Sequence, residues 1–87
     1  MKTYELKNGL SFVGNGLTHA RITESFDPET TTKYVLCIHW SCDNKVQELM
    51  FIKTVHTSLK AAKKYFLRNY DFMRQDNDCF ASAVWSV

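Results

Sequence analysis

The chain has 87 residues, of which 45% are apolar and 14% aromatic, enough for one domain with one hydrophobic core and too short for two. This composition excludes an intrinsically disordered chain. The formal net charge of +2 argues against an acidic nucleic-acid mimic and lends little support to a polycationic nucleic-acid binder. We therefore expect residues 1–87 to form a single soluble domain.

The first 26 residues predict three strands. Asn8 and Gly9 suit the two-residue turn of a β-hairpin, so residues 2–7 and 10–13 should pair with each other. A glycine-rich turn then resets the chain direction before a third strand at residues 18–26, and the segment DPETTT predicts a polar turn after it.

The segment TKYVLCIHWS alternates between two faces, which is typical of a β-strand. Tyr34, Leu36, Ile38 and Trp40 should share one face, and Val35, Cys37 and His39 the other. A turn at Asp43 and Asn44 would return the chain antiparallel through KVQELMFIK. The pairs that this turn predicts are Leu36 with Phe51, Ile38 with Leu49 and His39 with Glu48.

A helix is predicted after Thr57, which is expected to cap its first turn. Apolar side chains recur there at helical spacing, in one stripe formed by Leu59, Ala62, Phe66, Tyr70 and Met73. The polar segment RQDND follows, and CFASAVWSV is β-prone enough to return to the sheet as a last strand. The predicted fold is α+β, a mainly antiparallel sheet of about five to six strands with one amphipathic helix packed on one face.

Basic side chains form a row on the helix away from the apolar stripe. Lys60, Lys64 and Arg68 lie at successive four-residue intervals, with Lys63 at the border of the stripe. Such a row is typical of a solvated helix face, and it is also suited to an acidic protein surface or to phosphates. We expect its replacement by serine to distinguish these alternatives.

Two other clusters are weak candidates for chemistry. Cys37, His39 and Cys42 approach one another in a strand and turn, but a zinc site takes four ligands, and Cys79 stands apart in the sequence. His39 beside Glu48 suggests an acid and base pair, yet a flat sheet face offers neither a pocket nor an oxyanion hole. We expect no catalytic residue, no metal ligand and no cofactor.

The odd cysteine count, and a start at MKTYELKNG with no apolar signal segment, favour free thiols in a reducing cytoplasm. The longest apolar runs are far shorter than the roughly 20 residues that cross a bilayer. A cytoplasmic protein without membrane contact is therefore expected.

Residues 21–69 read as three strands followed by TSLKAAKKYF. This order resembles the three-stranded sheet and helix of plant ethylene-response-factor domains and of the arm-binding domains of tyrosine recombinases, in which the sheet enters the DNA major groove. Their helix has a similar residue pattern, seen here as Ala61, Ala62 and Tyr65. Where those sheets carry arginines and tryptophans on the DNA face, this chain has THARITES, CIHWS and VQELMF, and two further strands precede them.

The whole chain also resembles the small α+β proteins with which phages block host machinery, the anti-CRISPR proteins and polymerase inhibitors among them. The shared features are a meandering sheet, an amphipathic helix after MFIKT, a short aromatic strand in AVWSV, free cysteines and no catalytic motif. The resemblance implies a viral protein that acts in the host cytoplasm by stoichiometric occlusion.

These observations together predict a non-enzymatic binding protein, an inhibitor that occludes a host protein or ribonucleoprotein complex engaged in nucleic-acid processing. The alternative is a small DNA- or RNA-binding domain that uses the basic helix and the sheet. The candidate partner-binding residues are Lys60, Lys64 and Arg68 at the rim of the interface and Tyr65 as an aromatic anchor.

Overall fold

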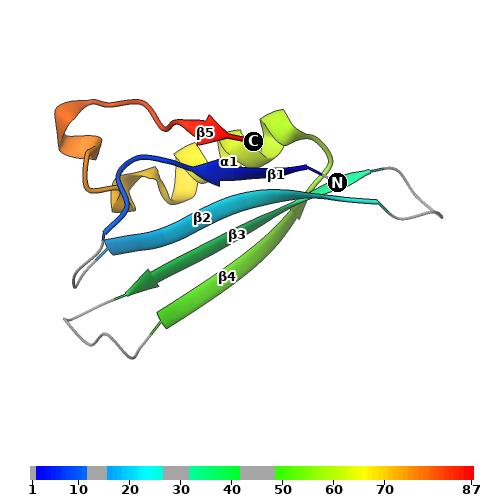
Figure 1. Ribbon diagram of the computed structural model, residues 1–87, viewed down its shortest axis with the longest axis horizontal. Helices are drawn as coiled ribbons and strands as arrows, with labels where there is room; N and C mark the ends of the chain where they lie inside the picture. Colours follow the sequence, from blue (N-terminus) through cyan, green and yellow to red (C-terminus); the bar gives the residue numbers. More distant parts are fainter. Residues whose placement is uncertain (1, 12–15, 27–31, 42–48) are drawn as a thin grey trace.

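The computed structural model describes residues 2–11, 16–26, 32–41 and 49–87. Its elements, in chain order, are β1 (Thr3–Leu6), β2 (Gly16–Ser25), β3 (Lys33–Ser41), β4 (Leu49–His56), α1 (Leu59–Asn69), the short 3-10 helices η1 (Asp71–Met73) and η2 (Asn77–Cys79), and β5 (Trp85–Ser86). In these ranges five strands form one antiparallel sheet in the order β4-β3-β2-β1-β5 (Figure 1). The predicted α+β fold is confirmed.

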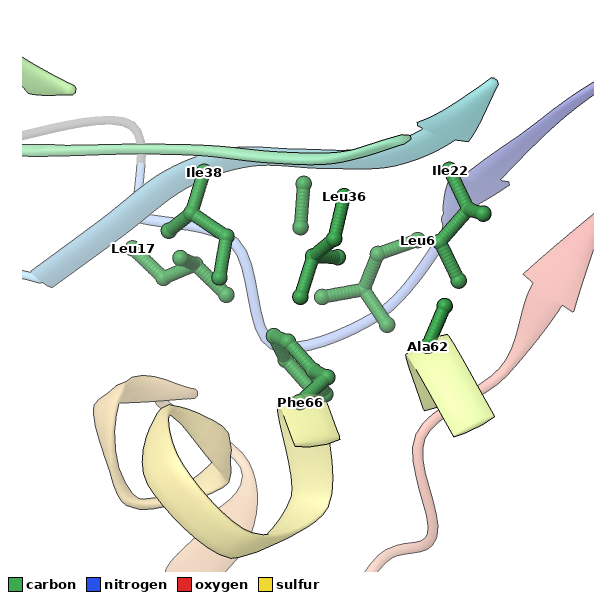
Figure 2. Close-up of a cluster of buried hydrophobic side chains, with 8 residues drawn as sticks. Leu6, Leu17, Ile22, Leu36, Ile38, Ala62 and Phe66 are labelled. Carbon is green, nitrogen blue, oxygen red and sulfur yellow. The ribbon is translucent and has the colours of Figure 1, made fainter. Parts of the chain in front are cut away.

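The hydrophobic core lies between one face of the sheet and α1. Figure 2 shows Phe66 and Ala62 of the helix pointing toward the strands, where Leu36 and Ile38 meet them. Phe66 is fully buried and packs edge-on against the ring of Trp85, 5.1 Å between centroids. The other fully or nearly buried apolar residues are Leu6, Leu17, Ala20 and Ile22. Burial of this apolar area drives folding of the sheet and helix together.

Strand β3 follows the predicted alternation. Leu36 and Ile38 are buried against the helix, and Tyr34 and Trp40 pack at the margin of the same core. The predicted strand at residues 18–26 is likewise confirmed as β2, which starts two residues earlier. An apolar and β-branched pattern was sufficient to identify both strands and the inward face of β3.

The predicted register between β3 and β4 is wrong. Ile38 pairs with Ile52 and His39 with Phe51, three positions further along than predicted. An odd shift exchanges the two faces of a strand, so Phe51 lies on the face away from the helix and is 54% exposed. The turn predicted at Asp43 and Asn44, and Glu48, lie outside the described residues. Both faces of this segment are apolar, so the pattern could not select one register.

The predicted hairpin between residues 2–7 and 10–13 is also wrong. β1 pairs with β2 instead, Tyr4 opposite Ile22, and Leu10 and Ser11 are not in a strand, while residues 12 and 13 lie outside the described ranges. Gly9 does adopt the positive φ expected of it, +75°. The Asn8 side chain, however, bonds to the C-terminal segment, with Nδ2 donating to the Ser82 carbonyl at 2.9 Å and Oδ1 accepting from the Val84 amide at 2.7 Å. The Asn-Gly turn is therefore hydrogen-bonded to the segment before β5 and does not close the predicted hairpin.

The helix begins one residue later than predicted. Ser58, not Thr57, is the N-cap, and its hydroxyl accepts a hydrogen bond from the Ala61 amide at 3.0 Å. The predicted apolar stripe is confirmed within α1, where Ala62 and Phe66 are buried and Leu59 packs against the core. Tyr70 and Met73 also pack against the core, but from beyond the helix, as its C-cap and in η1.

The C-terminal strand is shorter than the predicted residues 79–87. β5 contains only Trp85 and Ser86, and it adds to β1 at the edge of the sheet, with Trp85 opposite Leu6. The polar segment before it is ordered by Arg74, which is 4% exposed. Its guanidinium binds Asp71 at 2.7 Å, Asp76 and the Ala81 carbonyl. A buried cation thus organises the turn from helix to strand.

Candidate functional site

The basic row of α1 lies on the solvent side of the helix, as predicted. Lys60, Lys64 and Arg68 are exposed, and Lys63 is partly buried with its Nζ 5.8 Å from the centre of the Tyr4 ring. Among the described residues, none of the three exposed cations has an ion-pair partner. Three like charges along one helix face repel one another, so the row favours an acidic partner.

Asp71, three residues after Arg68, is spaced to relieve this repulsion. Its carboxylate is instead occupied by Arg74 and by the Asn77 side-chain amide, which donates to Oδ2 at 2.7 Å. The buried Arg74 therefore withdraws the nearest carboxylate from the basic row. The pKa of Arg74 is raised, first of all by its hydrogen bond to Asp71, so its charge is permanent.

Tyr65, the predicted aromatic anchor, is partly buried rather than exposed. Its ring packs at the margin of the core, 4.8 Å from the His56 ring and 6.0 Å from the Tyr70 ring, centre to centre. The structure thus places Tyr65 on the helix with the basic row but against neighbouring side chains. Leu67 and Phe80, which the sequence did not single out, are exposed at 54% and 95%, and both line a hollow beside α1.

Two adjoining hollows flank α1, and we call them together the α1 groove. The first is lined by Leu59, Lys60, Lys63, Lys64 and Leu67. The second shares Lys63 and Leu67 and continues past Phe80 to Ala83 and Trp85. Leu59, Leu67 and Trp85 thus give the groove an apolar lining, with lysines along the first hollow and the paired Asp71 and Arg74 in the second. A signal was available in the sequence, since Leu67 lies one helical turn from Lys63 and Lys64 and two turns from Lys60.

Phe80 owes its exposure to its backbone. It caps η2 in the left-handed region, with φ +59° and ψ +23°, and its amide donates to the Asn77 carbonyl. A bulky residue is uncommon in this conformation, which costs free energy relative to glycine. The turn therefore holds a phenylalanine out into solvent at the end of the α1 groove.

The structure describes only part of the two clusters that were weak candidates for chemistry. Cys37 is partly buried within β3 and Cys79 is exposed, both as free thiols, while Cys42 lies outside the described ranges. Within those ranges, no group of three or more histidine, cysteine or acidic side chains is arranged to hold a metal ion. His39 faces Phe51, not Glu48, in the cross-strand pairing.

The face of the sheet opposite α1, here called the open face, carries aromatic and basic side chains. The register predicted from the sequence did not bring them together. Phe51 and Lys53 of β4 lie on it beside His39 and Cys37 of β3, with His19 and Arg21 of β2 next in line. A shallow depression on this face includes Arg21, Cys37, Phe51 and Lys53. This cluster became visible only from the observed pairing.

No family model, no curated protein and no solved structure matches the chain. In the part of the chain that the structure describes, no helix is both long and apolar enough to span a membrane. The functional inference therefore depends on the two surfaces themselves.

Proposed function

We propose that this chain is a non-enzymatic binding protein that docks on a protein partner through the α1 groove. The partner is an acidic segment that also carries apolar side chains. The observation that supports it most is the combination in one groove of the exposed Leu67 with Lys60, Lys63 and Lys64. Phosphate groups would be bound by the lysines but would make no favourable contact with the exposed leucine and phenylalanine. A protein interface uses both kinds of contact.

The target class comes from the sequence resemblance to phage-encoded inhibitors. Complexes that process nucleic acid hold it in basic channels, so the basic groove would dock on an acidic protein segment of such a complex and occlude the surface around it. Rim charges mainly accelerate association, while desolvated apolar anchors slow dissociation. Lys60, Lys64 and Arg68 therefore steer the approach of the partner, and Leu67 and Phe80 anchor it through apolar contacts. Tyr65 packs between the helix and the core.

The proposed function is tested by photo-crosslinking from within the groove. A benzophenone amino acid replaces Leu67 in one variant and Val55, which is 61% exposed on the open face, in a control variant. Each is irradiated in nuclease-treated bacterial lysate, and the crosslinked peptide is sequenced. We expect an acidic segment with apolar side chains at position 67 and not at position 55.

Charge replacement completes the test. Substituting serine for Lys60, Lys64 and Arg68 should slow association with the captured partner, whereas substituting serine for Lys2, Lys7 and Lys33 removes the same charge elsewhere and should have little effect. Equal loss in both triple variants, or a crosslinked peptide without acidic residues, would contradict docking in the groove.

A further inference from the structure

No described helix or strand covers the open face, which lies on the side of the sheet away from α1 (Figure 1). Phe51 and Val55 are more than half exposed there, at 54% and 61%. A single exposed apolar side chain needs no explanation, but apolar side chains that gather on one face can mark a contact site. The open face is therefore a second surface, distinct from the α1 groove.

Three rings form a row across adjacent strands of this face. His19, His39 and Phe51 are directly paired from β2 to β4. The His19 and His39 rings are 5.6 Å apart, and the His39 and Phe51 rings are stacked at 5.1 Å with an interplanar angle of 21°. We call these three residues the ring row. At about 4.8 Å per strand, it spans roughly 10 Å.

A β-bulge in β2 places His19 in the row. Leu17 pairs with Trp40, but His19 pairs with His39, so β2 holds one extra residue, Thr18, at this point. Without the bulge, the alternation that buries Leu17 would bury position 19 as well. The extra residue turns His19 and Arg21 outward while Ala20 and Ile22 stay in the core.

Cations lie in the next row of the same face. Arg21 and Lys53 flank Cys37 in the cross-strand pairing. The Arg21 Nε–H donates to His19 Nε2 at 2.9 Å, and the Lys53 Nζ lies 5.8 Å from the centre of the Phe51 ring. At the described positions of β2, β3 and β4 on this face there is no carboxylate; Glu5, opposite Arg21 on β1, is paired with Lys7.

We propose that the open face binds single-stranded nucleic acid, with bases stacking on the ring row and phosphates contacting Arg21 and Lys53. Aromatic rings beside cations on an uncovered sheet provide both contacts that such strands use. A duplex conceals the faces of its bases within the stack, so the platform selects single strands. The proposal is independent of the α1 groove, which lies on the other side of the sheet.

The test measures fluorescence anisotropy of labelled oligo-dT and oligo-rU of about 16 nucleotides, the upper site size of a small single-strand binder, with a duplex of the same length for comparison. We expect salt-sensitive binding of the single strands, at least about tenfold tighter than of the duplex. Preference between the DNA and RNA arms identifies the natural strand.

Variants assign the site. Phe51→Ala should weaken binding by about tenfold or more through lost stacking, while Phe51→Trp should retain it. The matched control is Val55→Ala, an exposed apolar residue of the same strand and face, which should bind as the wild type does. Lys53→Ser should reduce the slope of log affinity against log salt by about one. The serine triple at Lys60, Lys64 and Arg68 should leave oligonucleotide binding unchanged, which separates this proposal from the proposed function.

Three results would overturn the proposal. They are failure of the wild type to bind either single strand, equal affinity for the duplex, and equal effects of Phe51→Ala and Val55→Ala. Urea unfolding of each variant checks that it is folded. If Phe51→Ala instead abolishes capture of a protein while no oligonucleotide binds, the open face is a protein interface and the proposal is wrong.

Discussion

Arg74 is the residue on which the C-terminal third depends. Its side chain is 2% exposed, with Asp71 and Asp76 17% and 29% exposed beside it. It joins η1, η2 and the segment before β5, because the Ala81 carbonyl accepts from the same guanidinium. A buried cation without these partners would be strongly unfavourable, and the partners without the cation would repel one another.

We predict that Arg74→Met lowers the free energy of unfolding by about 3 kcal/mol, since it leaves two neighbouring carboxylates without their cation. Arg74→Lys should also destabilise, because a lysine cannot reproduce the forked geometry. Urea unfolding measures both. A change below about 0.5 kcal/mol in Arg74→Met would show that the network is dispensable.

His19 gives the fold a pH dependence. Its pKa is lowered from 6.5 by burial, by Arg21 and by His39, with Glu5 acting in the opposite direction, and the pKa of His56 is lowered by burial. The unfolded chain therefore binds protons more readily than the folded one, so stability decreases as pH falls through 6.5 toward the folded-state pKa.

The urea concentration at the unfolding midpoint should therefore decrease as the pH is lowered from about 7.5 to about 5.5. This interval lies above the range in which carboxylates titrate. His19→Gln should reduce this dependence, with His56→Gln removing a further part. A midpoint that stays constant or rises on acidification in the wild type would contradict the assignment.

At the scale of elements, strand β4 shows both the reach and the limit of prediction from sequence. Its existence and antiparallel direction followed from composition and turn residues, but its register did not. Leu49 and Phe51 are as apolar as Met50 and Ile52, so either set would fill the core equally well in a sequence pattern. The observed register is defined by long-range packing of Ile52 against the core.

This register predicts that substitutions of two neighbouring residues in β4 change stability by unequal amounts. Ile52→Ala should cost about 2 kcal/mol through lost burial, at the lower end for such changes because Ile52 is only partly buried. Phe51→Ala should change stability by about 0.5 kcal/mol or less, since the ring is mostly exposed. Thermal or urea unfolding decides, and the reverse order of the two effects would restore the register predicted from the sequence.

One of the two candidate surfaces could be predicted from the sequence, and the other could not. The basic row on α1 was predictable because helical spacing alone places Lys60, Lys64 and Arg68 together. The ring row was not predictable, because it depends on a bulge at Thr18 and on the register of β3 with β4. No turn residue in the sequence indicates the bulge, and the apolar pattern fits more than one register. The Arg74 network was also hidden, since RQDND looks like an ordinary polar loop until its partners are known.

At the scale of the whole molecule, the sheet separates two contact surfaces. The α1 groove lies on the helix side of the sheet, and the ring row lies on the opposite, open face. Figure 1 shows the helix and the strands that carry these residues. The nucleic-acid-binding alternative, which uses the basic helix and the sheet together, would need a ligand that reaches both sides of the sheet. The two proposals together assign a protein contact and a single-strand contact to opposite sides of the sheet.

The most direct test of this two-surface account is an amide NMR titration of the ¹⁵N-labelled protein with oligo-dT and with oligo-rU. With the strand that binds, we predict that the largest shift changes fall on His19, Arg21, His39 and Lys53 of the open face, with little change at Lys60, Lys64 and Leu67 along the α1 groove. Changes centred on α1, or none with either strand, would contradict the account.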